Sequence, residues 1–376
     1  MHKFFPHSIV GLWCFVLLTF SSAPPIVFPQ SDGPFQVKYR EYELVDTSRL
    51  DPFNTTHLRR LMVSRFDPVP RQSCREVCKV QYLPTRTARI LEQKFLATVK
   101  FPPGYLEEAK LQVCCKYGHF PHAKSFPLLV FSPGFGGTRL GYAGIIQRIA
   151  SKGYTVVSVD HPYDALAVEF PDGTLIPSQD IQDFNRAVKV RVADMLFVID
   201  SLTRANSPLH RRQPVGIFGH SLGGNTAAGV MYKDPNIAGG VNLDGGIYDD
   251  ESIRGFGSNK TRQSFILWGA IGHNQTNDKS WTDFWIAMNT PPHDAVWKKE
   301  LSLTKTMHLT FSDIPEIVDL GKLRDKVGDV FGAIEGERNA QILGAYISAF
   351  FDFSLLGKPE GLLKGPSDMY PEVLFL

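Results

Sequence analysis

The sequence predicts an α/β fold, with a mostly parallel central sheet and helices packed on both of its faces. Short apolar runs alternate with helical patterns between residues 126 and 353, which is typical of βαβ units. One of these runs, 214–218, continues through Gly219-His220-Ser221-Leu222-Gly223-Gly224 into a stretch of small residues. Strand, G-x-S-x-G and helix in this order form a nucleophile elbow, a strained turn that presents a serine hydroxyl above the sheet.

The composition is that of an ordinary globular protein, because 43% of the 376 residues are hydrophobic and 21% are charged. This length allows one large α/β domain or two smaller ones, and we expect a single domain over 24–376. The net charge of +2 is near zero, so nothing suggests a nucleic-acid partner.

The N-terminus predicts a secretory signal peptide over residues 1–23. Lys3 and His7 precede an apolar run at 8–20, and Ser21-Ser22-Ala23 supplies the small residues of a cleavage site. The run is short for a membrane span, and an uncleaved anchor is the alternative. We therefore expect a secreted, extracellular protein.

Two further features agree with secretion. Asn54, Asn259 and Asn274 each begin an N-glycosylation sequon. The mature chain also keeps four cysteines, which in an oxidising compartment predict two disulfides with three possible pairings. These cysteines are Cys74, Cys78, Cys114 and Cys115.

All four cysteines fall in segment 71–125, which has weak periodicity and two proline clusters. We interpret it as an insertion that either overhangs the active site as a lid or lies on the surface. Residues 114–122 resemble a metal cluster, but they lack the ligand spacing of a zinc site. We expect no metal and no cofactor.

The remaining elements follow from periodicity. Residues 34–45 alternate as a half-buried strand does, and 58–66 form a second strand that Asp67-Pro68-Val69-Pro70 closes. Apolar runs predict the core strands, and a stripe with steps of three and four predicts the long helix 181–205. The expected core strands are 128–131, 154–160, 214–218, 239–244, 265–269 and 303–309, and the other helices are 141–152, 225–232 and 336–353.

Three connecting segments carry further interpretations. The glycine loop at 132–137 does not bind a dinucleotide, because G-x-G-x-x-G needs glycine where Arg139 stands. In the loop 161–177, His161 lies at a strand end where ligands bind, and we interpret it as a structural loop residue rather than a substrate contact. Segment 272–299 is an irregular, tryptophan-rich excursion whose rings either pack in the core or offer a lipid surface an apolar contact.

A serine hydroxyl needs a base, and in this fold the order along the chain is serine, acid, histidine. Asp244 directly follows a clear strand, which favours it as the acid over Asp278 and Asp283 in the later excursion. His308 follows the final core strand, which favours it as the base. The other candidate bases are His273 and His293.

The oxyanion hole needs two backbone N–H groups. One comes from Leu222, directly after the nucleophile, and the other from Phe135, which lies between glycines in the loop after the first core strand. In the predicted mechanism Ser221 attacks an ester carbonyl while His308 takes its proton. Asp244 holds the imidazole, and water then repeats the cycle on the acyl-enzyme.

These motifs together resemble the plasma-type platelet-activating factor acetylhydrolases of the α/β-hydrolase superfamily. The resemblance spans about residues 34–350, and together with the signal peptide it suggests a secreted fungal member. The motifs that carry it are Phe131–Gly136, Val159–His161, Arg191–Asp194, Gly219–Gly224, Leu243–Gly245 and His308–Asp313.

The resemblance implies an α/β-hydrolase fold and calcium-independent cleavage of short sn-2 acyl chains from phospholipids. It places the acid on Asp244, the base on His308 and the oxyanion groups on Phe135 and Leu222. Pro133 departs from the histidine that the family often has in this loop, and the segment 71–125 is unlike that of the animal enzymes.

Fold and triad do not fix a substrate. The alternatives are therefore a serine hydrolase of another small ester, of a polyester or of a biosynthetic intermediate. A binding protein on the same scaffold would be expected to lack a member of the triad, and the sequence supplies all three.

Overall fold

The computed structural model describes residues 26–94, 103–118, 126–203 and 214–376. The expected signal peptide therefore lies outside the described residues. In the described part of the chain, no helix has the length and apolar character that crossing a membrane requires.

The described strands and helices alternate through the second half of the chain. The strands are β1 Phe35–Leu50, β2 Leu58–Pro70, β3 Cys74–Gln81, β4 Lys110–Tyr117, β5 Leu128–Ser132, β6 Thr155–Val159, β7 Ala167–Glu169, β8 Leu175–Pro177, β9 Val215–His220, β10 Ile237–Leu243, β11 Ser264–Ala270, β12 Trp297–Leu303 and β13 Val373–Phe375. The α-helices are α1 Thr85–Lys94, α2 Ala143–Ala150, α3 Phe184–Thr203, α4 Leu222–Lys233, α5 Lys279–Met288, α6 Ile314–Leu320, α7 Arg324–Val327 and α8 Gly336–Leu356.

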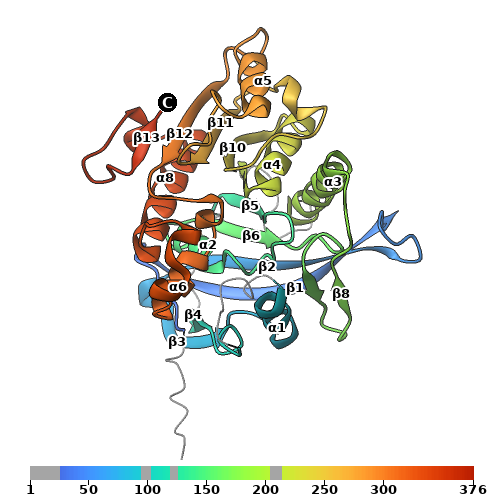
Figure 1. The fold of residues 1–376 in the computed structure, drawn as a ribbon, viewed down its shortest axis with the longest axis vertical. Coiled ribbons are helices and arrows are strands. Elements are labelled where there is room, and N and C mark those ends of the chain that lie inside the picture. Colours follow the sequence, from blue (N-terminus) through green and yellow to red (C-terminus); the bar gives the residue numbers. More distant parts are fainter. Residues whose placement is uncertain (1–25, 95–102, 119–125, 204–213) are drawn as a thin grey trace, which may run out of the picture.

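Among the described residues, one sheet has the strand order β1-β2-β6-β5-β9-β10-β11-β12-β13 (Figure 1). The run from β6 to β12 is parallel, whereas β1, β2 and β13 pair antiparallel at the two edges. The predicted fold class, a mostly parallel sheet with helices on both faces, is confirmed. The carboxyl ends of the parallel strands meet at one edge, where an α/β sheet binds its ligands.

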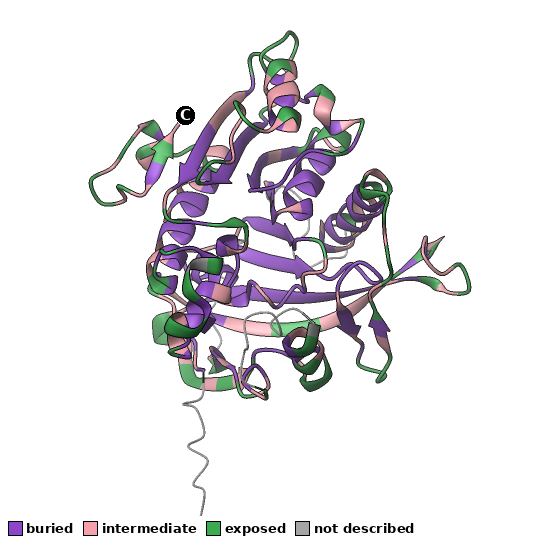
Figure 2. Ribbon diagram, viewed as in Figure 1, coloured by how far each residue is buried: buried purple, intermediate pink, exposed green. Residues whose placement is uncertain are grey.

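Two layers of helices cover the two faces of the sheet (Figure 1). Side chains of α2 and α8, such as Ile149 and Phe350, share one buried cluster with one face of the strands. Side chains of α3 and α4, such as Met195 and Val230, share a second cluster with the other face. Figure 2 shows the consequence, because the central strands are buried almost throughout and exposure is confined to the periphery.

The expected strand over 303–309 is wrong. The strand is β12, which pairs residue for residue with β11 from Trp297 to Leu303, and a short 3-10 helix, η4 (His308–Phe311), follows it. Lys305 has a φ of 60° and ends the extended conformation, because L-residues adopt that angle only in turns. The excursion 272–299 is also more regular than expected, since it contains α5 and the first three residues of β12.

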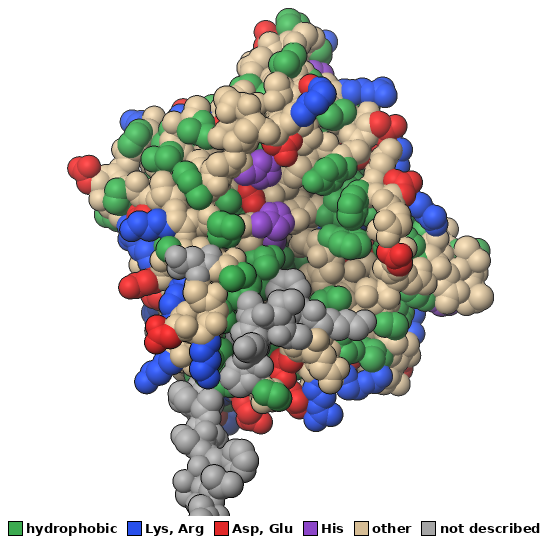
Figure 3. Space-filling model, viewed as in Figure 1, with side chains coloured by type: hydrophobic (Ala, Val, Ile, Leu, Met, Phe, Trp, Pro, Cys, Tyr) green, Lys and Arg blue, Asp and Glu red, His purple; other side chains and the backbone are tan. Residues whose placement is uncertain are grey.

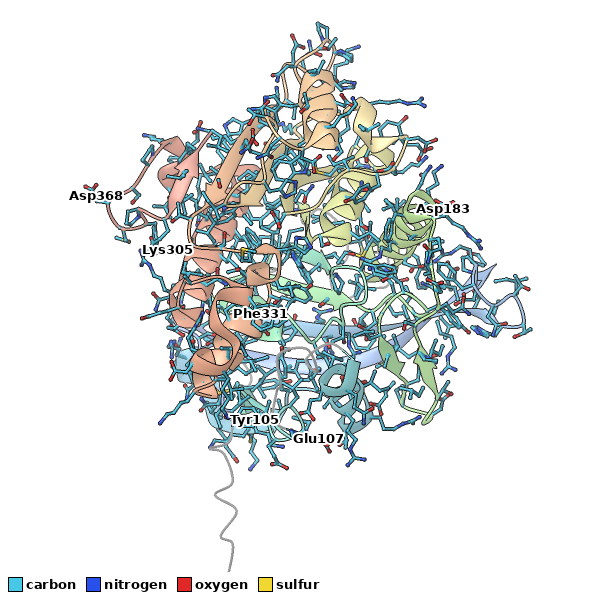
Figure 4. The ribbon with its side chains drawn as sticks, viewed as in Figure 1. Tyr105, Glu107, Asp183, Lys305, Phe331 and Asp368 are labelled. Carbon is cyan, nitrogen blue, oxygen red and sulfur yellow. A yellow bond between two sulfur atoms is a disulfide. The ribbon has the colours of Figure 1, made fainter. Side chains whose placement is uncertain are left out.

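The described residues of segment 71–125 pack into the main core. Two disulfides, Cys74–Cys114 and Cys78–Cys115, join β3 to β4 and fix the pairing that the sequence left open. Tyr82 and Leu106 of this segment lie in the same buried cluster as α2 and α8. The hydroxyl of Tyr105, labelled in Figure 4, donates to the carbonyl oxygen of Gly321 after α6 at 2.8 Å.

Candidate active site

The turn between β9 and α4 holds Ser221 in a conformation that few residues adopt. Its φ is 55° and its ψ is −126°, which stores strain of the kind found at functional sites. A Cβ atom on Gly223 would overlap the carbonyl oxygen of Ser132, so only glycine allows this approach between helix and strand. The serine therefore stands at the N-terminus of α4, where negative charge is favoured.

The structure brings the three expected residues of the triad into one hydrogen-bonded chain. The Nε2 atom of His308 lies 2.9 Å from the hydroxyl oxygen of Ser221, and its Nδ1 atom lies 2.6 Å from Oδ2 of Asp244. The carboxylate is buried, whereas nearly half of the histidine side chain is exposed. Figure 3 shows histidine side chains near the middle of this face, beside acidic groups and between apolar side chains.

The position of Asp244 depends on the end of β10. Its φ is 57°, and its N–H donates to the carbonyl oxygen of Trp268 at 2.8 Å, which turns the chain back over the sheet edge. Burial acts to raise the pKa of this carboxyl group. Hydrogen bonds from His273 and His308 outweigh burial and lower the pKa to about 2. The carboxylate is therefore charged across the neutral range.

The loop that carries His308 is held from two sides. Within η4, the Thr310 hydroxyl donates to the carbonyl oxygen of Phe331 at 2.7 Å and accepts from the N–H of Met307 at 2.8 Å. The N–H of Ile334 donates to the carbonyl oxygen of Lys305 at 3.1 Å. Figure 4 labels Lys305 and Phe331 on the chain around this loop.

The rival acids have other partners. One carboxylate oxygen of Asp278 caps α5, accepting from the N–H of Ser280 at 2.7 Å, and the other lies 3.0 Å from Nε2 of His273. Asp283 pairs with Lys279 at 2.7 Å on the exposed side of α5.

The rival bases also have other partners. Nδ1 of His293 lies 2.7 Å from the carbonyl oxygen of Gly257. His273 contacts the expected acid itself, with Nδ1 2.7 Å from Oδ1 of Asp244.

The loop that carries Phe135 is anchored from beneath. Buried Arg191 donates to the carbonyl oxygens of Pro133 at 2.5 Å and Gly134 at 3.1 Å, and it pairs with Asp164. Leu222 is the first residue of α4, where backbone N–H groups have no partner inside the helix. The structure thus places Phe135 and Leu222 on the two segments that adjoin Ser221.

Sequence reasoning did not identify a second buried network behind the nucleophile. The N–H of Gly134 donates to the Tyr142 hydroxyl at 3.1 Å, and this hydroxyl lies 2.8 Å from Nδ1 of His220. Nε2 of His220 lies 2.8 Å from the carbonyl oxygen of His308, which can only accept, so Nε2 carries the proton and Nδ1 accepts from Tyr142. Burial and the nearby His308 lower the pKa of His220 to about 3, which agrees with a neutral ring.

An apolar cavity of about 130 Å³ opens beside Ser221 and His308. Its walls come from two parts of the chain that are far apart in sequence. Leu83, Leu91 and Leu106 of the disulfide-bearing segment form one side, and Leu309, Ile314 and Ile317 form another. Segment 71–125 therefore contributes to the site rather than lying apart from it.

Beginning at Phe135, which lines the cavity, exposed aromatic rings form a row along the site. The ring centroid of Phe135 lies 5.2 Å from that of Phe184, which lies 5.9 Å from that of Tyr248. Met307, next to the expected base, is also about half exposed.

The other singled-out residues have structural surroundings. His161 is buried, with Nε2 3.0 Å from the Ser132 hydroxyl and Nδ1 3.0 Å from Asp194, so its interpretation as a structural residue is confirmed. Asn259 is exposed, and the side-chain oxygens of Asn54 and Asn274 accept hydrogen bonds from the threonines of their own sequons.

Comparisons with known proteins agree with this geometry. A family model described as platelet-activating factor acetylhydrolase, isoform II, matches residues 28–170. A curated protein of Arthroderma benhamiae named "Probable 1-alkyl-2-acetylglycerophosphocholine esterase" is 41% identical over 376 residues, covering 95% of each chain. Among solved structures, a ferulic acid esterase from Streptomyces cinnamoneus superimposes with a TM-score of 0.76 at 29% identity, covering 94% of this chain and 100% of that one.

Proposed function

Since the chain belongs to the platelet-activating factor acetylhydrolase family and is a carboxylic ester hydrolase, we propose that it removes short sn-2 acyl groups from phospholipids. Its preferred substrate class is that of 1-alkyl-2-acetylglycerophosphocholine. The observation that carries the proposal is the hydrogen-bonded chain from Ser221 through His308 to Asp244, which ends in a small apolar cavity.

We infer a mechanism in which Ser221, His308 and Asp244 act in turn. His308 accepts the hydroxyl proton at Nε2 as Ser221 attacks the ester carbonyl, and Asp244 stabilises the imidazolium through Nδ1–H. The oxyanion is stabilised by the N–H groups of Leu222 and Phe135. His308 then protonates the leaving lysophospholipid alcohol, and water attacks the acyl-enzyme with the same base.

The size of the cavity supports a short acyl group. An apolar cavity of about 150 Å³ holds a benzene molecule. The cavity beside Ser221 is apolar and measures about 130 Å³, which supports a small acyl group such as acetyl or propionyl over a palmitoyl chain.

We further propose that the enzyme is secreted and acts at the surface of lipid aggregates. Two disulfides support an oxidising compartment. Contact with lipid is supported by the exposed apolar side chains of Phe135, Phe184 and Met307. Figure 3 shows apolar side chains on the face around the histidines. The row of rings would lie against acyl chains or the glycerol backbone while the acetyl group enters the cavity.

One observation favours a second substrate class, esters of aromatic acids. The row Phe135, Phe184 and Tyr248 offers faces and edges on which an aromatic ring can stack. The similar solved structure is named for ferulic acid. A feruloyl group is larger than benzene, so in this alternative its ring would lie along the row of aromatic side chains beside the cavity.

The test compares the secreted protein with its Ser221→Ala variant on p-nitrophenyl esters from acetate to palmitate, without calcium. Short-chain phospholipids and methyl ferulate are assayed alongside. We expect hydrolysis of acetyl esters and of 2-acetyl phospholipids, with a loss of at least about 10⁴-fold in the variant. Equal rates for the two proteins would refute the assignment of Ser221, and a preference for methyl ferulate would favour the second substrate class.

A further inference from the structure

Asp244 is bonded to two histidines at once. His308 contacts Oδ2 at 2.6 Å, and His273 contacts Oδ1 at 2.7 Å, where the N–H of Ala270 also donates. On its other side, Nε2 of His273 lies 3.0 Å from Asp278. His273 and Asp278, which sequence reasoning weighed as a rival base and a rival acid, thus extend the triad away from Ser221.

The contacts of His273 fix its protonation. Each ring nitrogen faces a carboxylate oxygen, and an ionised carboxylate only accepts hydrogen bonds. Both nitrogens must therefore carry a proton, which makes the ring an imidazolium. In agreement, the two carboxylates outweigh burial and raise the pKa of His273, while the pKa of Asp278 is lowered by its hydrogen bonds to Ser280 and Trp281 and by the charge of His273 in spite of its burial.

The surroundings hold this ring in place. It lies against the buried indole of Trp281, with centroids 4.2 Å apart, and the indole N–H donates to the carbonyl oxygen of Gly245 directly after the acid. Buried Glu300 interacts with the charge of His273, and burial raises the pKa of that carboxyl group. The carboxylates of Asp244 and Asp278, which contact the ring directly, favour the charged form of His273.

We propose that His273 is a positioning residue that, as an imidazolium, anchors Asp244 and offsets part of the negative charge that Asp244 presents to His308. This inference rests on the proposed role of the triad. A neutral His273 would leave the full carboxylate charge facing His308, which would hold a proton more strongly. The base strength of His308 is then set by the ionisation of a second histidine that does not touch the substrate.

The proposal predicts a specific shape for the pH profile of kcat/KM. In the wild type, the limb at low pH reports protonation of the general base, and a second inflection at higher pH reports loss of the proton from His273. Asn at position 273 keeps a neutral donor near the place of Nδ1. His273→Asn should therefore move the acidic limb up by roughly half a unit or more and abolish the second inflection.

The substitution Asp278→Asn tests the same proposal and leaves the imidazole of His273 unchanged. It removes one of the carboxylates that favour the charged form, so the second inflection should move to lower pH. Asp283→Asn is the matched control, because this aspartate lies on the same helix and pairs only with Lys279 in the described structure. Its profile should match that of the wild type.

Histidine ¹⁵N spectra of the Ser221→Ala protein, assigned with His273→Asn, should show His273 doubly protonated above pH 6.5. Profiles that differ from the wild type by one constant factor at all pH values would overturn the proposal and leave His273 a packing residue. Activity that survives Ser221→Ala would instead refute the proposed function, so the two failures are distinguishable.

Discussion

Around Ser221, three backbone segments approach so closely that no Cβ atom fits between them. A side chain on Gly219 would overlap the carbonyl oxygen of Gly223, one on Gly223 would overlap Ser132, and one on Gly245 would overlap Ser221 itself. The turn that carries Ser221, the end of β5 before the Phe135 loop and the turn after Asp244 thus pack directly against each other at glycines. The geometry of the site therefore depends on Gly219, Gly223 and Gly245 as well as on the residues of the expected triad.

Gly223→Ala should therefore destabilise the protein by about 3 kcal/mol and abolish esterase activity, because the clash is with backbone that cannot rotate away. Urea unfolding and the rate of p-nitrophenyl acetate hydrolysis measure the two effects. Gly365→Ala is the control, since its added Cβ meets no atom within 4 Å. An active, stable Gly223→Ala protein would show that the elbow does not need this approach.

Among the secondary-structure elements, the sequence predicted those strands and helices that have a clear apolar pattern. Strands β5, β9 and β10 are runs of buried residues, so their ends placed Ser221 and Asp244 correctly at one sheet edge. The start of β12 was not predicted, because Lys298, Lys299 and Glu300 interrupt its apolar pattern. Its backbone nevertheless pairs with β11. His308 was found in spite of this error, because it follows the same strand end.

Contacts between distant elements left no signal in the sequence. Tyr142 and His220 are 78 positions apart, and neither spacing nor composition links them. The contact of His273 with Asp244 was missed for a similar reason, since a histidine near an acid was weighed only as a rival base. Pairings of this kind follow from the packed fold and not from local pattern.

The disulfides close two nearly coincident loops, with sequence separations of 40 and 37 residues. Losing one bond should cost under ~1 kcal/mol of unfolding free energy, because the other still closes almost the same loop. Losing both, in a protein with Cys74, Cys78, Cys114 and Cys115 replaced by serine, should cost about 4 kcal/mol. Urea titrations of one-pair and two-pair variants measure this, and additive losses would contradict it.

The side chains of segment 71–125 that line the cavity should determine which acyl-chain length the enzyme prefers in its ester substrates. Leu106→Ala removes a buried side chain that lines the cavity, so the enlarged space should shift the preference from acetate towards butyrate and hexanoate esters. Leu363→Ala truncates an equally buried leucine in the same core cluster, outside the residues that line this cavity. An unchanged chain-length profile in Leu106→Ala would show that the acyl group lies elsewhere.

For the molecule as a whole, buried histidines and buried carboxyl groups have opposite effects on how the free energy of unfolding depends on pH. Burial lowers the pKa of His220 to about 3 and also lowers that of His161, so their contribution is present above about pH 6.5 and is lost as pH falls. Burial raises the pKa of Asp313 to about 7 and that of Glu316 to about 8. These carboxyls contribute stability at low pH that is lost as pH rises from about 4 towards 8.

The two effects oppose each other between about pH 4.5 and 6.5. Above that range the carboxyl effect continues, and the raised pKa of His273 acts in the same direction, because its contribution is lost as pH rises. Wild-type stability should therefore fall between pH 6.5 and 8. Glu316→Gln should remove most of this decline and exceed the wild type by roughly 3 kcal/mol at pH 9, with no advantage at pH 4. Urea unfolding across this range measures the difference, and parallel curves for the two proteins would contradict it.

The cavity is lined by parts of the chain that can change independently over evolutionary time. The expected nucleophile, acid and base all lie within residues 221–308, whereas Leu83, Leu91 and Leu106 line the cavity from before the parallel core begins. Mutations in that early segment alter the space for the acyl group without touching a reacting atom. Two lineages can therefore inherit the same catalytic residues and diverge in the ester that they accept. The substitutions responsible would be expected in the disulfide-bonded segment.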